Sequence, residues 1–290
     1  NIAIVLLVLS MAPAAFAAPQ ARWETTILFT HDLHSHFLPQ DTEDGGQSGG
    51  YARLKTAIDR EKAQHPDALL LDGGDFSIGS LIQTLYVDEG AELRTMGALG
   101  YDVGTIGNHE FDYGMDQFMA LTEKANFPYV SANFVDKDGN PFFDAYKIIE
   151  AGGWKIAFVG VSTPETLFKS NPVNFQDAEG NFIYSFCGEG DGKGVYGAAQ
   201  NAVDAARAEG ADIVIAITHL GTDAASIPFT SNDLIMNTTG IDAVLDGHSH
   251  STWEQEMVKN AASEEVILTS TGTKLENVGV LTITEGEEGA

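Results

Sequence analysis

Short apolar runs rich in β-branched residues alternate along the chain with amphipathic stretches of helical period. The apolar runs predict strands at residues 25–30, 68–71, 103–106, 129–132, 156–161, 213–218, 243–245, 266–270 and 278–284. The amphipathic stretches predict helices at residues 51–64, 91–99, 115–124 and 196–209. Two polar, glycine-rich stretches, residues 40–50 and 175–194, predict surface loops. This alternation is typical of an α/β protein, and 290 residues allow one large domain or two small ones.

Side chains of the types that bind metal ions follow five of the predicted strands directly. They form the clusters Asp32 with His34, Asp75, Asn108 with His109, His219, and His248 with His250. In open α/β sheets the loops at the carboxyl ends of the strands converge, and ligands bind there. We therefore expect the five clusters to meet in one site.

The residue types in these clusters restrict the kind of metal. Imidazole and carboxylate together suit manganese, iron, zinc or cobalt, and the absence of cysteine ligands argues against a structural zinc site. Gly74, Gly107 and Gly247 stand beside the clusters. Glycine lets the backbone turn tightly, so we expect these three residues to let the ligand side chains point inward.

Taken one at a time, most of these signals also occur in proteins without a metal. An Asp-x-His or Gly-Asp pair is common in turns, and a single histidine at a strand end, such as His219, is more often a core residue. Gly107-Asn108-His109-Glu110 is the most specific cluster, because no simple turn rule demands that order. The inference therefore depends on five signals in one order, each at a strand end.

The order D-x-H, G-D, G-N-H-E, H and G-H-x-H resembles the signature of the calcineurin-like metallophosphoesterases, over nearly the whole chain. Residues 49–54, 108–114 and 219–221 resemble more narrowly the 5'-nucleotidase and 2',3'-cyclic-nucleotide phosphodiesterase branch of that superfamily. The resemblance implies a four-layer α-β-β-α sandwich with two mixed β-sheets over residues 24–290. It also implies that the metals lie at the carboxyl-terminal edge of the sheets.

The resemblance further implies two divalent metal ions held by seven residues. One ion would be bound by Asp32, His34 and His250, the other by Asn108, His219 and His248, with Asp75 bridging both. Manganese, zinc, iron and cobalt all accept such ligands, so the identity of the metal stays open. Two divalent ions outweigh two carboxylates and leave the pocket at about +2, which suits a phosphate. Ions about 3.5 to 4 Å apart can hold phosphoryl oxygens and lower the pKa of a bound water to about 7, for in-line attack by the resulting hydroxide.

Not every histidine is needed as a ligand. His109 is predicted to stabilise the transferring phosphoryl group or to protonate the leaving oxygen, since its unperturbed pKa lies near neutrality. Asp112, three residues on, would orient its ring if the chain turns helically, and the family resemblance supports this pair. His31 and His36 flank the first ligand pair and are either supports for the ligands or simple loop residues. His65 is predicted at the surface.

The charge balance restricts the partners. A net charge of −27 repels polyanions, so nucleic-acid polymers and anionic membranes are excluded as partners, and a nucleotide or other small phosphoester is the expected substrate. Cys187 is the only cysteine, so no intrachain disulfide can form, and its glycine-rich surroundings predict a loop residue rather than a nucleophile. The oligomeric state stays open.

The first residues of the chain predict export. An apolar run at residues 2–9 precedes Ala15-Phe16-Ala17, which has the A-x-A form that signal peptidase cleaves. We expect a signal peptide over residues 1–18 and a secreted, periplasmic or cell-surface protein. A retained membrane anchor is the weaker alternative, because the run is short for a membrane span and Pro13 interrupts it. The basic region that should precede the run is missing and the chain begins with Asn1, so we expect the true N-terminus to lie upstream.

The function expected from the resemblance is hydrolysis of nucleotide phosphate esters, at the 5' position or in 2',3'-cyclic form. In that family a second, C-terminal domain supplies aromatic residues that stack on the base, and we expect this domain to be absent from the chain, either because the sequence is a fragment or because the protein has a single domain. One alternative is a thiosulfohydrolase built on the same scaffold. Another is a catalytically inactive domain that binds metal or a partner.

Overall fold

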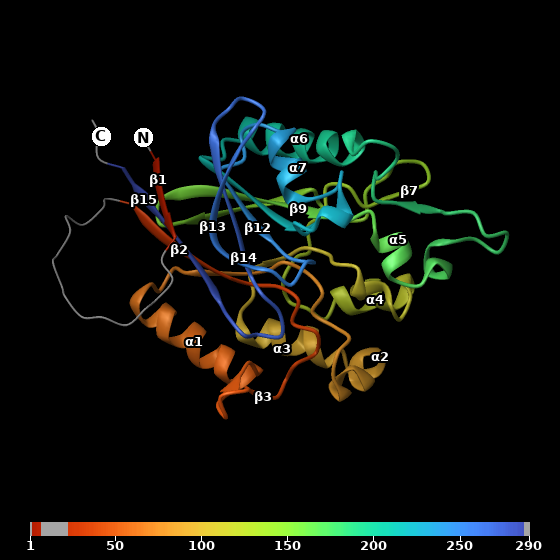
Figure 1. The fold of residues 1–290 in the computed structure, drawn as a ribbon, viewed down its shortest axis with the longest axis horizontal. Helices are drawn as coiled ribbons and strands as arrows, with labels where there is room; N and C mark the ends of the chain where they lie inside the picture. The colour runs from red at the N-terminus through yellow and green to blue at the C-terminus, as the bar shows by residue number, and fades with distance from the viewer. Residues whose placement is uncertain (1, 7–22, 287–290) are drawn as a thin grey trace.

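Two mixed β-sheets lie face to face in the computed structural model, which describes residues 2–6 and 23–286 (Figure 1). The first sheet has the order β1-β15-β2-β5-β6, with bounds Ile2–Leu6, Gly279–Glu285, Glu24–Thr30, Leu69–Asp72 and Val103–Gly104. The second has the order β13-β14-β12-β11-β9-β8, with bounds Thr252–Lys259, Glu265–Thr271, Ala243–Asp246, Ile213–His219, Trp154–Ser162 and Tyr146–Ala151. Parallel pairing joins β2, β5 and β6 in one sheet and β9, β11, β12 and β14 in the other. The ligand-bearing loops follow these parallel strands.

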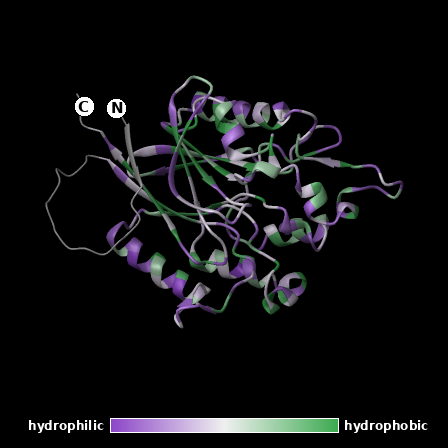
Figure 2. Cartoon of the chain, viewed as in Figure 1, coloured by the Kyte–Doolittle hydropathy of each residue, from purple (hydrophilic) through white to green (hydrophobic). Residues whose placement is uncertain are grey.

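Strand β11 explains why the central strands appear in the sequence as continuous apolar runs. Ile213, Ile215 and Ile217 belong to the core between the two sheets. Val214 and Ala216 point to the opposite face and belong to the core beneath α6. A strand that is buried on both faces needs apolar residues at every position. In Figure 2 the central strands are accordingly coloured mainly as hydrophobic, whereas the outer helix α1 carries many hydrophilic residues.

Helices cover the outer face of each sheet and complete four layers (Figure 1). The longer helices are α1 (Tyr51–Gln64), α3 (Ala91–Leu99) and α4 (Met115–Thr122) on the first sheet, and α6 (Lys193–Ala208) with α7 (Ser231–Met236) on the second. The shorter helices are α2 (Tyr86–Glu89), α5 (Thr166–Lys169), η1 (Leu81–Leu85), η2 (His109–Phe111), η3 (Pro172–Phe175) and η4 (Ala224–Ser226). The expected α-β-β-α sandwich with two mixed sheets is confirmed.

One predicted strand is wrong, and β1 in the first sheet and β8 and β13 in the second were not predicted. Residues 129–132 make only the isolated bridges Gly104↔Tyr129 and Val130↔Asp144, because the segment crosses from the first sheet to the second. Strands β8 and β13 lie at the two edges of the second sheet, where polar residues interrupt the apolar ones and no long apolar run forms.

The predicted loops contain short paired segments. Residues 40–50 include a small hairpin, β3 (Gln40–Asp41) with β4 (Gln47–Ser48). Residues 175–194 include β10 (Tyr184–Ser185), which pairs with β7 (Val135–Asp136), and they end at the start of α6. Cys187 is a half-buried loop residue, as expected.

Only part of the predicted signal peptide is described. Residues 2–6 form β1, which pairs antiparallel with β15. The expected cleavage motif at Ala15-Phe16-Ala17 lies outside the described residues, so the signal peptide stays a prediction. Within residues 2–6 and 23–286, no helix has the length and apolar character needed to span a membrane.

Candidate metal centre

Three groups of potential ligands meet at the carboxyl edge of the sheets. The groups are Asp32 with His34 and His250, His34 with Asp75 and His109, and Asp75 with His219 and His248. In each group, one ligand atom from every residue lies within 4.8 Å of the others. Clusters that are as far apart in the sequence as Asp32 and His250 are therefore neighbours in space, as their strand-end positions predicted.

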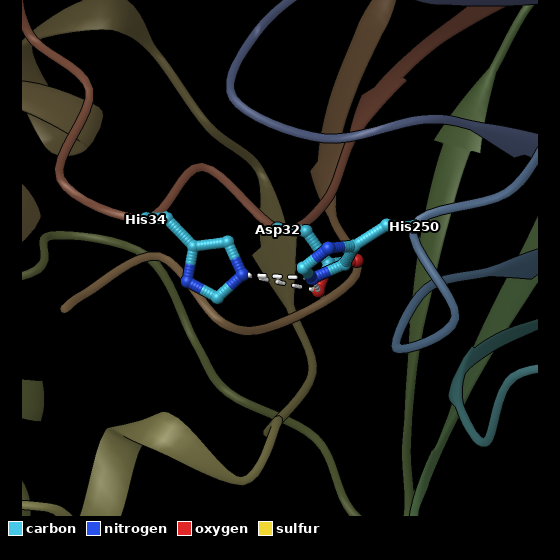
Figure 3. Close-up of side chains that lie close together, drawn as sticks. All are labelled: Asp32, His34 and His250. Carbon is cyan, nitrogen blue, oxygen red and sulfur yellow. Dashed lines mark hydrogen bonds and ion pairs between the residues drawn. The ribbon is translucent and has the colours of Figure 1, made fainter. Parts of the chain in front are cut away.

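The first group surrounds a point where its nitrogen and oxygen atoms converge (Figure 3). The Nε2 atoms of His34 and His250 lie 2.9 Å apart. Asp32 Oδ1 lies 3.1 Å from His250 Nε2 and 3.6 Å from His34 Nε2. Two imidazoles and a carboxylate that face one another in this way suit a transition-metal cation.

Asp75 belongs to the second and the third group, and His34 links the second group to the first. Asp75 Oδ2 lies 3.1 Å from His219 Nε2. A carboxylate shared by two ligand groups has the position that the resemblance assigns to a bridging ligand.

Unpartnered buried atoms provide a test of whether these residues fit metal ions. Ten buried side-chain nitrogen and oxygen atoms of the described residues have no hydrogen-bond partner, and three of them, Asp32 Oδ1, Asn108 Oδ1 and His219 Nε2, meet at this site. Asp32 Oδ1 and His219 Nε2 face only other predicted ligands, His250 and Asp75. Buried polar atoms in proteins are nearly always hydrogen-bonded, so each exception needs a reason. These three atoms belong to residues predicted as ligands from the sequence, whereas the other seven belong to residues that were not. Because the unpartnered atoms and the ligand types agree, the residues fit the two metal ions that the resemblance implies.

The backbone of the predicted ligands is unusual. Five of the seven have a left-handed conformation, and their φ angles are 50° for Asp32, 46° for His34, 56° for Asp75, 77° for His248 and 51° for His250. Such conformations cost about 1–3 kcal/mol each and gather at functional sites, where the surrounding structure holds them. The fold therefore accepts local strain to aim these side chains at one point.

Of the three flanking glycines, only Gly74 has the positive φ that the expected tight turn needs, whereas Gly107 and Gly247 provide space for the ligands. A Cβ atom on Gly107 would lie 2.2 Å from Asp75 Oδ1, and one on Gly247 would lie 3.0 Å from Asp32 Oδ2. Gly74 has a φ of 90°, and its Cβ would lie 2.5 Å from the Gly107 nitrogen. Side chains at these positions would displace the ligands.

His31 is one of the supports that the sequence left undecided. The backbone N–H of Thr271 donates to His31 Nε2 over 2.7 Å, so the ring proton must reside on Nδ1. Nδ1 then donates to Asp32 Oδ2 over 2.5 Å, and the same oxygen accepts the His248 N–H over 2.9 Å. These two donors occupy Oδ2, which leaves Oδ1 to face His34 and His250. His36 Nδ1, by contrast, lies 2.6 Å from the carbonyl oxygen of His34, and His65 lies partly exposed near Glu24.

Glu110 and Glu165 are supports that the sequence did not reveal. Glu110 accepts the backbone N–H groups of Asp75, Phe76 and Gly107 over 2.6–3.2 Å and so ties the loop after β5 to the loop after β6. Burial raises the pKa of Glu110 to about 7, and the charge of Asp75 adds to this. Glu165 Oε2 lies 3.0 Å from His248 Nε2, which leaves Nδ1 as the free nitrogen of that ring. The position of Glu165 just after strand β9 was the signal that could have revealed it.

His109 and Asp112 form the expected pair. His109 Nδ1 lies 2.6 Å from Asp112 Oδ2, and Ser170 donates to Asp112 Oδ1 over 2.7 Å. Burial lowers the pKa of His109, but the hydrogen bond to Asp112 and the charge of Asp75 outweigh it and raise the pKa to about 9. The ring centroid of His109 lies 5.4 Å from that of His34. The pair therefore borders the first ligand group with a protonated imidazole.

His219 carries a proton that a metal ion would have to displace. Burial lowers its pKa, but the charges of Asp75 and Asp32 outweigh burial and raise the pKa to about 10. The same interaction holds the pKa of Asp75 well below its usual range. In the metal-free protein the imidazolium thus offsets part of the negative charge of the two carboxylates.

Comparisons with known proteins bear on the family and the fold of the chain. Residues 25–252 match the family model for calcineurin-like phosphoesterases. A bovine 5'-nucleotidase is 33% identical over 83% of the chain, and the chain spans only 41% of that relative. The crystal structure of a 5'-nucleotidase precursor from Thermus thermophilus is 26% identical, with a TM-score of 0.77 over 91% of this chain and 52% of that one. The sulfate thiohydrolase SoxB of Thermus thermophilus, at 22% identity and a TM-score of 0.73 over 92% of this chain and 54% of its own, shares the fold.

Proposed function

This chain belongs to the calcineurin-like phosphoesterase family, and from that premise we propose that it hydrolyses phosphate esters of nucleotides at a two-metal centre. The superfamily predicted from the motif order is confirmed, and so is the class of metal-dependent phosphoester hydrolase at the level of the family. The finer proposal is a nucleotide ester in the 5' or the 2',3'-cyclic form. It is supported by the relatives named 5'-nucleotidase and by the resemblance of residues 108–114 and 219–221 to that branch.

The observation that carries the proposal is the sharing of Asp75 between two ligand groups, one with His34 and His109 and the other with His219 and His248. We assign Asp32, His34 and His250 to one ion, Asn108, His219 and His248 to the other, and Asp75 to both. The ions are manganese, zinc, iron or cobalt, which these nitrogen and oxygen ligands accept alike. When bound, the ions supply positive charge for the phosphoryl oxygens and lower the pKa of a water ligand.

The side chains around the ions have separate tasks in this proposal. His109 Nδ1 is held by Asp112, so Nε2 is the atom that can donate a proton to a phosphoryl oxygen or to the leaving oxygen. Ser170 fixes the far oxygen of Asp112 and keeps the pair aligned. His31 leaves Asp32 Oδ1 free for the metal, and Glu165 orients His248.

Two other functions remain distinct candidates. The thiosulfohydrolase alternative has the support of a shared fold alone, since SoxB is 22% identical. An inactive binding domain would have no use for the aligned pair of His109 and Asp112.

We also propose that the protein is exported, on the basis of residues 2–9 and the A-x-A motif that follows them.

A substrate panel separates these candidates. Release of phosphate from nucleoside 5'-monophosphates or 2',3'-cyclic nucleotides, in the presence of manganese, zinc or cobalt, is the expected result. Release of sulfate from a thiosulfonate conjugate, without any release of phosphate, would establish the thiosulfohydrolase instead. Stoichiometric metal with no hydrolysis of any ester would establish a binding domain and overturn the proposal.

A further inference from the structure

A single short segment, residues 163–170, contacts both halves of the candidate metal centre. The segment begins just after β9 and contains the helical turn of α5 (Figure 1). Near its first end, Glu165 Oε2 lies 3.0 Å from His248 Nε2. At its other end, Ser170 donates to Asp112 Oδ1 over 2.7 Å. The segment therefore connects the loop after β12, in the second sheet, with the loop after β6, in the first.

Hydrogen bonds within the segment hold its two ends at a fixed separation. The backbone N–H of Lys169 donates to the Glu165 carbonyl over 2.7 Å. The backbone N–H of Ser170 donates to the carbonyl of Thr166 over 3.2 Å. Thr166 is fully buried, and its hydroxyl donates to the Thr163 carbonyl over 2.7 Å. Because these bonds close one turn of helix, a displacement of one end moves the other end as well.

The two ends of the segment are also held by neighbouring loops. The buried Ser226 donates to Glu165 Oε2 over 2.9 Å, which fixes the carboxylate that contacts the metal ligand. Just beyond the other end, Asn174 Nδ2 donates to the Phe111 carbonyl over 2.7 Å. This bond ties η3 to η2, the turn that carries His109. The segment is thus anchored on both sides of the site.

We propose that residues 163–170 form a brace that fixes the proton donor, His109, relative to the metal ligand His248. Glu165 and Ser170 are its positioning residues. This inference rests on the proposed function, because it takes His109 as the side chain that acts on the phosphoester. A displacement of a catalytic group by about 1 Å can cost about 100-fold in rate, so a fixed spacing favours turnover. The brace also requires that a change at Ser170 reaches the metal ion assigned to His248.

Zinc titrations without substrate test the brace independently of catalysis. Among the described residues, Ser170 forms hydrogen bonds with Asp112 and Thr166 and with none of the predicted ligands. We nevertheless expect Ser170→Ala to weaken the binding of one zinc ion about threefold, a size typical of coupling through a rigid element. Glu165→Ala removes the contact to His248 itself and should weaken this binding about tenfold or more. In the double variant the loss should be smaller than the product of the two single losses, because one released end already frees the other.

Val173→Ala is the matched control, because Val173 is 69% exposed on the neighbouring η3. It should bind zinc as the wild type does, and circular dichroism should show every variant folded. Ser170→Cys, whose thiol is a weaker donor of similar size, should show a smaller loss than Ser170→Ala. Wild-type affinity in Ser170→Ala, or losses that multiply in the double variant, would overturn the brace, since the two ends would then act separately.

Steady-state kinetics at saturating zinc provide the second measurement. In Ser170→Ala we expect the kcat for a nucleoside 5'-monophosphate to fall about tenfold, because His109 is less well placed, while the KM stays unchanged. A raised KM with an unchanged kcat would contradict the brace. If the wild type hydrolyses no phosphoester, the proposed function fails, and the zinc titrations still decide whether the segment is a brace.

Discussion

At the scale of single residues, the neighbours of Asp32 determine which of its two carboxylate oxygens can bind a metal ion. Its Oδ2 accepts hydrogen bonds from His31 and from the backbone of His248, whereas its Oδ1 is buried without a hydrogen-bond partner. The sequence could predict Asp32 as a ligand, because the D-x-H pair follows a strand. It could not predict the support from His31, since that depends on Thr271, which lies 240 residues away.

Replacing His31 should therefore weaken metal binding. In His31→Ala, Asp32 Oδ2 loses a charge-assisted donor, and such changes behind a ligand typically cost about 10- to 100-fold in metal affinity. The affinity is measured by competition with a chromophoric chelator. His65→Ala, which alters a partly exposed histidine remote from the centre, is the control. Unchanged affinity in His31→Ala would mean that the hydrogen bond to Asp32 has no part in shaping the site.

At the scale of elements, a strand can be predicted from its apolar run when both of its faces are buried. The central strands were predictable because both of their faces are buried, as in β11. The edge strand β13 was not, because six of its eight positions are exposed or half-buried polar or aromatic residues that form no apolar run. Residues 129–132 are apolar for another reason: the N–H of Val130 donates to Gly104 in the first sheet and that of Ala132 to Gly160 in the second. A segment that links two sheets has buried side chains without being a strand.

The turn after β6 gives a test at this scale. Gly107→Ala should abolish binding of at least one metal ion, because the new Cβ would lie 2.2 Å from Asp75 Oδ1. Gly197→Ala in α6 is the matched control, since a Cβ there meets no atom within 4 Å. It should bind metal normally and raise the free energy of unfolding by up to about 1 kcal/mol, because alanine favours a helix over glycine. Metal content is measured by atomic emission, and normal content in Gly107→Ala would refute the packing argument.

At the scale of the whole molecule, the fold brings together buried carboxylates whose negative charge a bound cation would offset. The whole chain has a net charge of −27, and a cation bound at the centre makes this net charge less negative. The motif order predicted both the sandwich and the convergence of the ligands, because strand ends in parallel sheets share one edge.

Metal removal should accordingly destabilise the protein. Excess manganese or zinc at about 1,000 times its Kd stabilises the folded state by about 4 kcal/mol per site. For a domain of this size we expect the Tm to rise by about 8 °C or more over the chelated protein. Differential scanning calorimetry with and without a chelator checks this. Identical Tm values would show that the clustered ligands do not bind the added metal.

The central claim is that Asp75 joins two metal ions into one catalytic centre, and paired measurements of metal content and phosphoesterase rate test it most directly. The wild type should hold two ions per chain and hydrolyse its substrate. His109→Ala should keep both ions and lose most of the turnover, whereas Asp75→Ala should lose metal and turnover together. Normal turnover in Asp75→Ala, or two ions retained by it, would contradict the account.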